Sequence, residues 1–387
     1  MHEPSVTLAT EWSLLLTACS QISPEEKAER IRAHLQKPIN WKALCHLADH
    51  HGVRPLLYQS LDAIETDVPR EELRVLQRLH QTNVHKTLFL SRELIRIVEH
   101  LSAQGLEILP YKGLALAEAV YGDIALRQAG DIDLLIRPQD FARVRDAVAD
   151  LGYTAQTSLP AAQERAYLKS GYECAFDGTA GRNLLEVQWA LQPRFYAVDF
   201  DMEGLFRRAV TIDVAGHSMK TPSSEDLFIV LALHAAKHVW GRLVWLCDLE
   251  RIMSAPTLDW NWIGPQARRL GIVRILRVTM MLARDMLGAV IPVAAERNLP
   301  SDSAEHVLAK EIEPHITSAM TYNVESPAYF RLMMRLRERR GDRLRFLHRL
   351  TFTPGPSEWQ AVRLPTALFP LYRLVRVSRL AARLLRS

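Results

Sequence analysis

Apolar positions in the first hundred residues recur every three or four residues, which is the spacing of amphipathic helices. The pattern predicts helices over residues 11–22, 24–35, 41–50 and 69 to about 104. Pro24 is followed by two glutamates. Proline fits the first helical turn and acids favour the positive end of the helix dipole, so this triplet supports a helix start.

The periodicity changes at Gly105, where short apolar runs replace the helical pattern. Strands are expected near residues 106–111, 131–136, 152–156, 172–177 and 183–189, alternating with helices near 114–121 and 138–150. This alternation is typical of an α/β or α+β domain. Residues 208–221 follow as a predicted hairpin, with its turn at Ala215–Gly216.

After residue 221 the pattern is helical again to the end. The run 221–226 combines a serine cap with acids, which predicts a helix start. We expect the following helices to be broken at Pro256, Pro265, Pro292, Pro300 and the loop 353–356. The chain therefore divides into three regions, residues 1–104, 105–221 and 222–387.

Candidate chemistry lies at two of the predicted strands. Side chains alternate along a strand, so Asp131 and Asp133 point the same way, and a doubly acidic, oxygen-rich site suits Mg²⁺. Upstream, an apolar strand breaks at Gly113 and leads into a helix. A glycine at such a turn lets backbone N–H groups approach phosphate, and Lys112 adds positive charge. Together they suggest chemistry on a nucleoside triphosphate.

In these residues the chain resembles the nucleotidyltransferase superfamily, whose members have a polymerase β-like palm. The string from Lys112 to Leu135 is similar to one branch, the uncharacterised bacterial nucleotidyltransferase family proteins. Blocks at 41–61, 224–249 and 364–376 also resemble that group, so the likeness spans most of the chain. The implied fold is α+β: a nucleotidyltransferase palm, a mixed sheet with flanking helices, between N-terminal and C-terminal helical regions.

The resemblance implies a function and roles for individual residues. The chain would transfer NMP from an NTP such as ATP to a hydroxyl-bearing small molecule, peptide or protein and release pyrophosphate. Asp131, Asp133 and Glu186 would be catalytic and would bind Mg²⁺ or Mn²⁺. Other residues would hold the nucleotide: Lys112 and Gly113 at the phosphates, Arg127 at the departing pyrophosphate, and Lys237, His234 and His238 facing the cleft from a later helix.

Two departures from the superfamily pattern keep an alternative open. Leu114 follows Gly113 where a serine or glycine is usual, and Gln188 stands where a histidine often follows the third acid. A catalytically degenerate palm that binds nucleotide or peptide as an accessory of a biosynthetic cluster would fit these changes. Lys112 can also be read as an ion-pair partner of an acid, Arg127 as an anchor for the Asp strand, and Glu186 as an ordinary strand-edge acid.

The helix carrying His234 and His238 allows a further reading. Histidines four residues apart share one helix face and could hold Zn²⁺, but no third ligand is evident in the nearby sequence. Trp240, Trp245 and Leu243 are expected in the core. The role of Asp248 stays open: its carboxylate would either accept a hydrogen bond from an N–H group or be a partner of the two histidines.

Composition fits a soluble cytoplasmic enzyme. Hydrophobic residues make up 48% of the 387 positions and charged residues 24%, and no uninterrupted apolar run of membrane-spanning length occurs. The start of the chain lacks a signal-peptide pattern. The four cysteines are scattered without a CxxC pair, which indicates reduced thiols rather than a disulfide framework.

Charge is unevenly distributed. Residues 328–387 carry fourteen arginines and three acids, against a net charge of +4 for the whole chain. Solvated or internally paired arginines are the simpler reading. The alternative is peripheral contact with an anionic partner through Arg-rich C-terminal helices, for instance anionic lipid. Since no nucleic-acid-binding module accompanies the arginines, the pattern does not favour nucleic acid.

Overall fold

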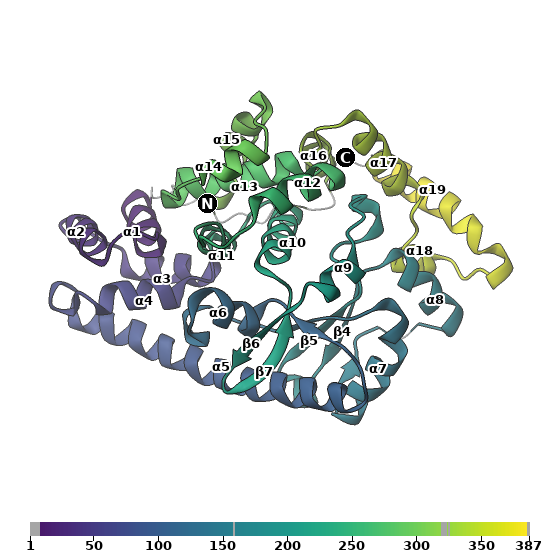
Figure 1. The fold of residues 1–387 in the computed structure, drawn as a ribbon, viewed down its shortest axis with the longest axis horizontal. Coiled ribbons are helices and arrows are strands. Elements are labelled where there is room, and N and C mark those ends of the chain that lie inside the picture. The colour runs from purple at the N-terminus through teal and green to yellow at the C-terminus, as the bar shows by residue number, and fades with distance from the viewer. Residues whose placement is uncertain (1–7, 158, 319–322, 324–325, 385–387) are drawn as a thin grey trace, which may run out of the picture.

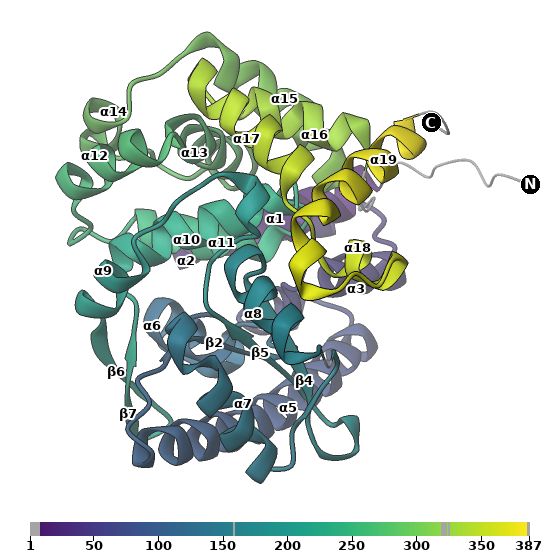
Figure 2. The same cartoon turned by 90° about the vertical axis from the view of Figure 1, so that its right-hand side faces the viewer.

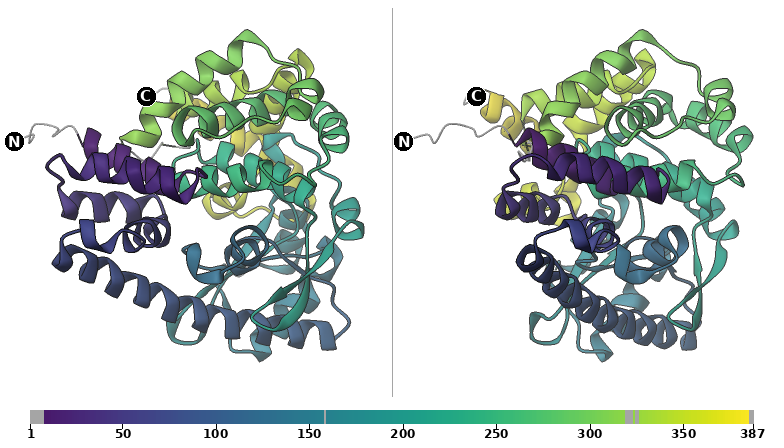
Figure 3. Two further views of the ribbon diagram at one scale, coloured as in Figure 1. Left: turned by 60° about the vertical axis from the view of Figure 1, so that its left-hand side comes forward. Right: turned by 90° about the vertical axis from the view of Figure 1, so that its left-hand side faces the viewer.

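The structure is a computed structural model that describes residues 8–157, 159–318, 323 and 326–384. Helices form its N-terminal part: α1 (Ala9–Cys19), α2 (Pro24–Leu35), α3 (Trp41–His50), α4 (Arg54–Asp62), the short η1 (Glu65–Asp67) and α5 (Arg70–Ala103). Helix α5 is long enough to leave this group and run beneath the sheet (Figures 1 and 3). It therefore connects the N-terminal helices to the α/β part of the molecule.

A five-stranded mixed sheet forms the central layer. Its strands are β1 (Leu109–Pro110), β2 (Ile132–Leu135), β3 (Thr154–Ala155), β4 (Glu173–Asp177) and β5 (Leu184–Gln188), in the spatial order β1-β2-β5-β4-β3. The central pair β2–β5 is parallel and the other neighbours are antiparallel. In the parallel pair Asp133 lies beside Glu186. Two acids from distant parts of the sequence thus become neighbours.

Shorter elements surround the sheet. They are α6 (Gly113–Tyr121), η2 (Ile124–Leu126), η3 (Pro138–Asp140), α7 (Phe141–Asp150), α8 (Ala161–Ser170), η4 (Thr179–Gly181), η5 (Arg194–Tyr196), α9 (Met202–Arg207) and the hairpin β6 (Val210–Val214)–β7 (His217–Thr221). One hydrophobic cluster joins α5, α7 and the sheet, with Leu94, Val144 and Val187 among its buried members. This packing fixes the sheet on α5.

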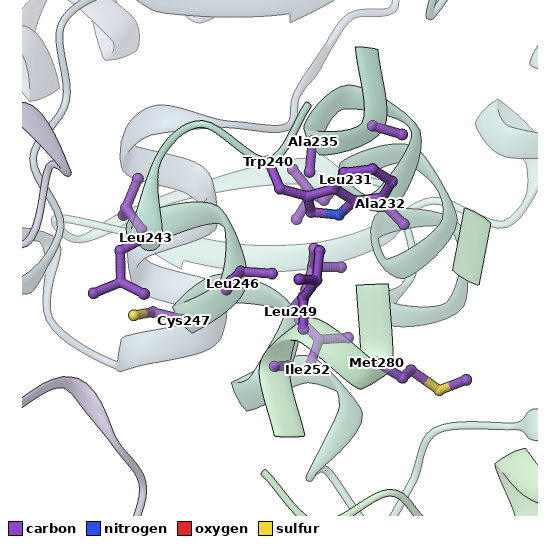
Figure 4. Close-up of a cluster of buried hydrophobic side chains, with 14 of the residues drawn as sticks. Leu231, Ala232, Ala235, Trp240, Leu243, Leu246, Cys247, Leu249, Ile252 and Met280 are labelled. Carbon is purple, nitrogen blue, oxygen red and sulfur yellow. The ribbon is translucent and has the colours of Figure 1, made fainter. Parts of the chain in front are cut away.

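The C-terminal half is helical, and Figure 1 shows it above the sheet. Its elements are α10 (Ser224–Lys237), α11 (Leu243–Met253), α12 (Trp260–Leu270), α13 (Val273–Leu287), α14 (Val293–Asn298), α15 (Ser303–Thr317), α16 (Pro327–Arg335), α17 (Arg340–Phe352), α18 (Pro356–Ala361), η6 (Thr366–Leu371) and α19 (Tyr372–Leu384). Trp240 packs among aliphatic side chains of α10, α11 and α13 (Figure 4). The same large cluster includes residues of α1, α3 and α4, so the N-terminal helices share this core.

Most predicted elements occur, with small shifts of their ends. The Ala215–Gly216 turn is confirmed, since both residues have positive φ between β6 and β7. The helix start near residue 224 is also confirmed, because the Ser223 side chain caps α10 by accepting from the Asp226 N–H. Helix α8 is an addition that the pattern did not predict. The apolar residues of α8 do not recur at the spacing of one buried helix face, so the sequence pattern gave no helical signal there.

The expected break at Pro265 is wrong, because Pro265 lies inside α12. A proline removes one intrahelical hydrogen bond and normally kinks or ends a helix. Here the helix continues because it buries Trp260, Ile263, Ala267 and Leu270 along one face. Packing of that face offsets the lost bond.

Among the helices of the described residues, none combines the length and apolar character that crossing a membrane requires.

Candidate active site

A pocket of about 600 Å³ lies where the sheet, the N-terminal helices and α10–α11 meet. All of the sequence-predicted site residues line it: Lys112, Gly113, Arg127, Asp131, Asp133, Glu186, His234, Lys237 and His238. The structure therefore brings together residues that span more than a hundred positions in the sequence. The sheet forms one wall and α10 with the start of α11 forms the other.

The sheet wall is acidic. Asp133 on β2 and Glu186 on β5 are paired in register, and Asp131 directly precedes β2. On β4, Glu173 pairs with Gln188, and residues 186 and 188 share one face of β5. Glu173 thus adds a fourth carboxylate to the same wall, and it also lines the pocket.

These carboxylates raise one another's affinity for protons. Burial, reinforced by Asp133 and Glu173, raises the pKa of Glu186 to about 8. Burial and the neighbouring Asp133 likewise raise the pKa of Asp131. Both shifts mean that negative charge on this wall is incompletely balanced by the protein itself. A bound cation would relieve the imbalance.

The donor set fits a hard divalent cation, since the three proposed ligands Asp131, Asp133 and Glu186 all offer carboxylate oxygens to one pocket. Within the described residues no three His, Cys, Asp or Glu side chains are already grouped closely enough to hold one ion. The carboxylate oxygens are therefore the right kind of ligand for the ion, and the three side chains would have to move closer together to bind it.

Lys112 supplies the one ion pair on the acidic wall among the described residues. Its Nζ lies 2.9 Å from Asp133 Oδ1, with both side chains nearly buried. Burial disfavours the charged ammonium, but Asp133 and Tyr111 outweigh this and hold the pKa of Lys112 above its usual value. Lys112 therefore stays positively charged beside the carboxylates.

Gln188 links two carboxylates of the acidic wall to the Tyr111 hydroxyl. Its amide nitrogen donates to Asp133 Oδ1 at 3.2 Å and to Glu186 Oε2 at 3.0 Å. The Tyr111 hydroxyl donates to Gln188 Oε1 at 2.5 Å, which fixes the amide orientation. The residue that departs from the superfamily pattern thus holds two candidate ligands in place.

Gly113 begins α6 with a φ of +52°, a conformation that favours glycine. A Cβ at this position would meet the Asp131 backbone oxygen at 3.2 Å. The turn therefore packs closely against the residue that opens the acidic strand. This contact explains why a glycine is needed here, independently of any ligand.

Arg127 is held by a second, separate buried cluster. Its guanidinium donates to both oxygens of Asp248 at 2.9–3.1 Å, and the Tyr121 hydroxyl donates to the same carboxylate at 2.7 Å. Burial opposes its charge, while Asp248 raises the pKa of Arg127. This geometry supports the reading of Arg127 as an anchor, and it gives Asp248 a partner other than the histidines.

The wall opposite the sheet carries rings and cations. The His234, His238 and Trp245 rings lie with their centroids 4.9–5.5 Å apart. Burial and the nearby lysines lower the pKa of His234 and lower that of His238 to about 3. Lys237 Nζ lies 3.3 Å from the Tyr172 hydroxyl, and burial lowers its pKa. Both imidazoles are therefore neutral near pH 7.

Sequence reasoning missed several polar residues of the pocket, among them Lys86 on α5, Tyr172, Glu173 and Arg242. Lys86 and Arg242 are exposed and have no ion-pair partner among the described residues. No local pattern distinguishes Lys86 from the other charged positions of a long amphipathic helix. Glu173 could be recognised only once the β4–β5 register is known.

Comparison with known proteins gives one family. The model of the family described as "Uncharacterised nucleotidyltransferase" matches residues 37–288. A solved solution structure of the antibiotic-resistance factor ANT(2'')-Ia has 16% sequence identity and a TM-score of 0.29, covering 52% of this chain and 95% of that chain. No curated protein matches.

Proposed function

Because the chain belongs to the family of uncharacterised nucleotidyltransferases and is thus a transferase, we propose that it moves a nucleoside monophosphate from an NTP to a hydroxyl-bearing acceptor. Pyrophosphate is the second product. One observation carries this proposal: a four-carboxylate sheet wall faces a wall of cations and neutral rings across a single pocket. A triphosphate with a divalent cation needs both surfaces at once.

In this proposal Asp131, Asp133 and Glu186 hold Mg²⁺ or Mn²⁺. When bound, the ion supplies positive charge to the phosphate oxygens, where negative charge builds up during transfer. The raised pKa values of Asp131 and Glu186 support this assignment, because both carboxylates lack a full complement of protein cations.

Cations of the pocket bind the phosphates. Lys112 is charged and lies beside the acidic wall, and the backbone at Gly113 offers the N–H groups at the start of α6. Lys86 and Arg242 are exposed and unpaired among the described residues, so their charge is available to a ligand. Arg127 is already bound bidentately by Asp248, so we assign it to positioning Gln128–Asp131 rather than to pyrophosphate.

The group-transfer step needs three changes at once. The acceptor hydroxyl oxygen forms a bond to the α-phosphorus, and the bond from that phosphorus to the oxygen bridging the β-phosphorus breaks. Glu186 takes the hydroxyl proton, and the electron pair of the broken bond leaves on pyrophosphate. Burial raises the pKa of Glu186 to about 8, so its carboxylate, once ionised, is a stronger base than that of an exposed glutamate.

The test uses the 387-residue chain with each of the four NTPs, with and without Mg²⁺, and a panel of hydroxyl acceptors. We follow thermal stabilisation and pyrophosphate release together. We expect Mg²⁺-dependent stabilisation and release with one NTP, both lost in Asp131→Asn. The matched control is Asp150→Asn, since Asp150 is exposed at the end of α7.

Two results would contradict the proposal. If Asp131→Asn turned over as fast as the wild type, the acidic wall would not be the reaction centre. If nucleotide bound in every case without pyrophosphate release, the chain would be a nucleotide-binding accessory protein instead.

A further inference from the structure

A second pocket, of about 780 Å³, lies where the palm meets the C-terminal helices. Helix α8 forms one side, and α17, α18, η6 and α19 form the other. Figures 1 and 2 both place α8 next to α18, which are far apart in the sequence. None of the proposed catalytic residues lines this pocket.

The pocket is basic. Its cations come from both sides, with Lys169 on α8, Arg194 on η5 and Arg373 on α19. All three are exposed, and none forms an ion pair with an acid in the described part of the chain. The described lining includes no Asp or Glu. Arg349 also lines it but is already paired with Asp199 at 2.6 Å. The unpaired charge therefore favours an anionic ligand.

Aromatic side chains form the floor. Trp359 and Tyr372 are 4% and 1% exposed, and Phe352 at the rim is 41% exposed. Stacking of nucleobases needs open ring faces, which the two buried rings do not offer. Phe352 and Leu374 in the same lining are 41% and 65% exposed, so they offer apolar surface that a peptide side chain inserted between acidic ones would cover.

The two pockets are joined by a short stretch of backbone. Ser170 lines the second pocket, while Tyr172 and Glu173 line the catalytic pocket. An extended chain covers at most about 3.6 Å per residue, so Ser170 and Glu173 lie within about 11 Å along the backbone. A polypeptide bound in the second pocket could therefore reach the acidic wall with a few residues.

We propose that this second pocket docks an acidic, aromatic-containing stretch of a polypeptide acceptor and so presents a nearby hydroxyl side chain to the catalytic pocket. The inference rests on the proposed transferase function and narrows its acceptor class. Unpaired cations on both sides, the exposed apolar side chains of Phe352 and Leu374 and the short link to Glu173 are the observations that carry it.

The experiment measures binding of a fluorescein-labelled synthetic peptide that alternates glutamate with phenylalanine and tyrosine. Fluorescence anisotropy is recorded for the wild type and for Lys169→Glu, Arg373→Glu and the double variant. Arg182→Glu is the matched control, since Arg182 is exposed and lies beyond the other end of β4, outside the pocket lining. A peptide with lysine in place of glutamate tests for charge.

We expect the acidic peptide to bind, with affinity falling about tenfold or more in the double variant because two attractive contacts become repulsive. Arg182→Glu should bind like the wild type, and the lysine peptide should not bind. Phe352→Ala provides a variant without charge change and should weaken binding by a smaller factor. Equal thermal unfolding midpoints establish that each variant is folded.

Three outcomes would overturn the inference: no binding of the acidic peptide, equal weakening by Arg182→Glu, or binding to phosphatidylglycerol vesicles or single-stranded DNA in place of the peptide. NTP-induced stabilisation, measured in the same variants, separates this inference from the proposed function. If the double variant no longer binds the peptide but is still stabilised by nucleotide, the docking proposal is supported. If the wild type binds peptide but no NTP, the transferase proposal fails on its own.

Discussion

Two charge clusters, one buried and one partly buried, lie a few residues apart in this molecule and are built in opposite ways. In one, Arg127 donates three hydrogen bonds to the two carboxylate oxygens of Asp248, and the Tyr121 hydroxyl donates a fourth. In the other, four carboxylates share a sheet wall with one ion pair, from Lys112 to Asp133, among the described residues. The first cluster balances its charges, and the second does not.

The difference distinguishes an ion pair that stabilises the fold from a group of acids suited to binding a ligand. A buried pair with matched geometry satisfies itself and holds α6, η2 and α11 together. An excess of buried acid is costly in the absence of a ligand, and the raised pKa values of Asp131 and Glu186 record that cost. Such imbalance is a feature of functional sites.

The largest expected effect comes from Asp131→Asn. Among the described residues no hydrogen bond or ion pair engages the Asp131 carboxylate, so the change removes repulsion without leaving a partner unpaired. We expect transfer to fall about 1000-fold or more, equivalent to about 4 kcal/mol. The urea-unfolding free energy should be unchanged or higher. A clear loss of stability would show that Asp131 is a structural acid.

The same chemical change at Asp248 should act in the opposite sense. Asp248→Asn leaves the buried Arg127 guanidinium without its anion, so the free energy of unfolding should fall by about 3 kcal/mol. Urea unfolding measures it, with Asp131→Asn as the matched comparison. Stability equal to that of the wild type would mean that the balanced cluster does not hold the helices together.

Gln188 provides the next test, because it links the acids to each other. Gln188→Leu removes both amide contacts, and we expect activity to fall about 10- to 100-fold with a higher Mg²⁺ concentration for half-maximal rate. Tyr111→Phe removes only the hydroxyl that orients the amide and should have a smaller effect of the same kind. A normal Mg²⁺ requirement in both variants would remove Gln188 from the site.

The smallest effect concerns Glu250, a buried acid outside the pocket lining. Burial raises its pKa to about 7, and its Oε2 has no hydrogen-bond partner in the described part of the chain. Between pH 4.5 and 7 the folded state binds more protons than the unfolded state, so stability should fall as pH rises through this window.

Glu250→Gln should remove that part of the pH dependence, as measured by urea unfolding across the window. The exposed Glu29→Gln is the control and should keep the wild-type slope. An unchanged slope in Glu250→Gln would mean that Glu250 is already balanced. A confirmed slope would show that burial raises the pKa of an acid outside the candidate site as well.

Much of the fold was predictable because its signals are local. Helical period, the Ser223 cap, the Ala215–Gly216 turn and the short strands all depend on neighbours within a few residues. Strand alternation predicts Asp131 and Asp133 on one side, and both line the pocket, although Asp131 lies at the bend before β2. Pro265 shows the limit, since packing of a helix face overrode a local breaking signal.

The sequence by itself determined which residues could carry the chemistry: the acids of β2, Gly113 at its turn and Lys112 beside it. Only the tertiary structure decided their neighbours. Strand register placed Asp133 beside Glu186 and Glu173 beside Gln188, helix packing brought Asp248 to Arg127, and α5 contributed Lys86. The reason is physical: a side chain's type is local, whereas its charge balance depends on groups that the folded chain brings from distant positions.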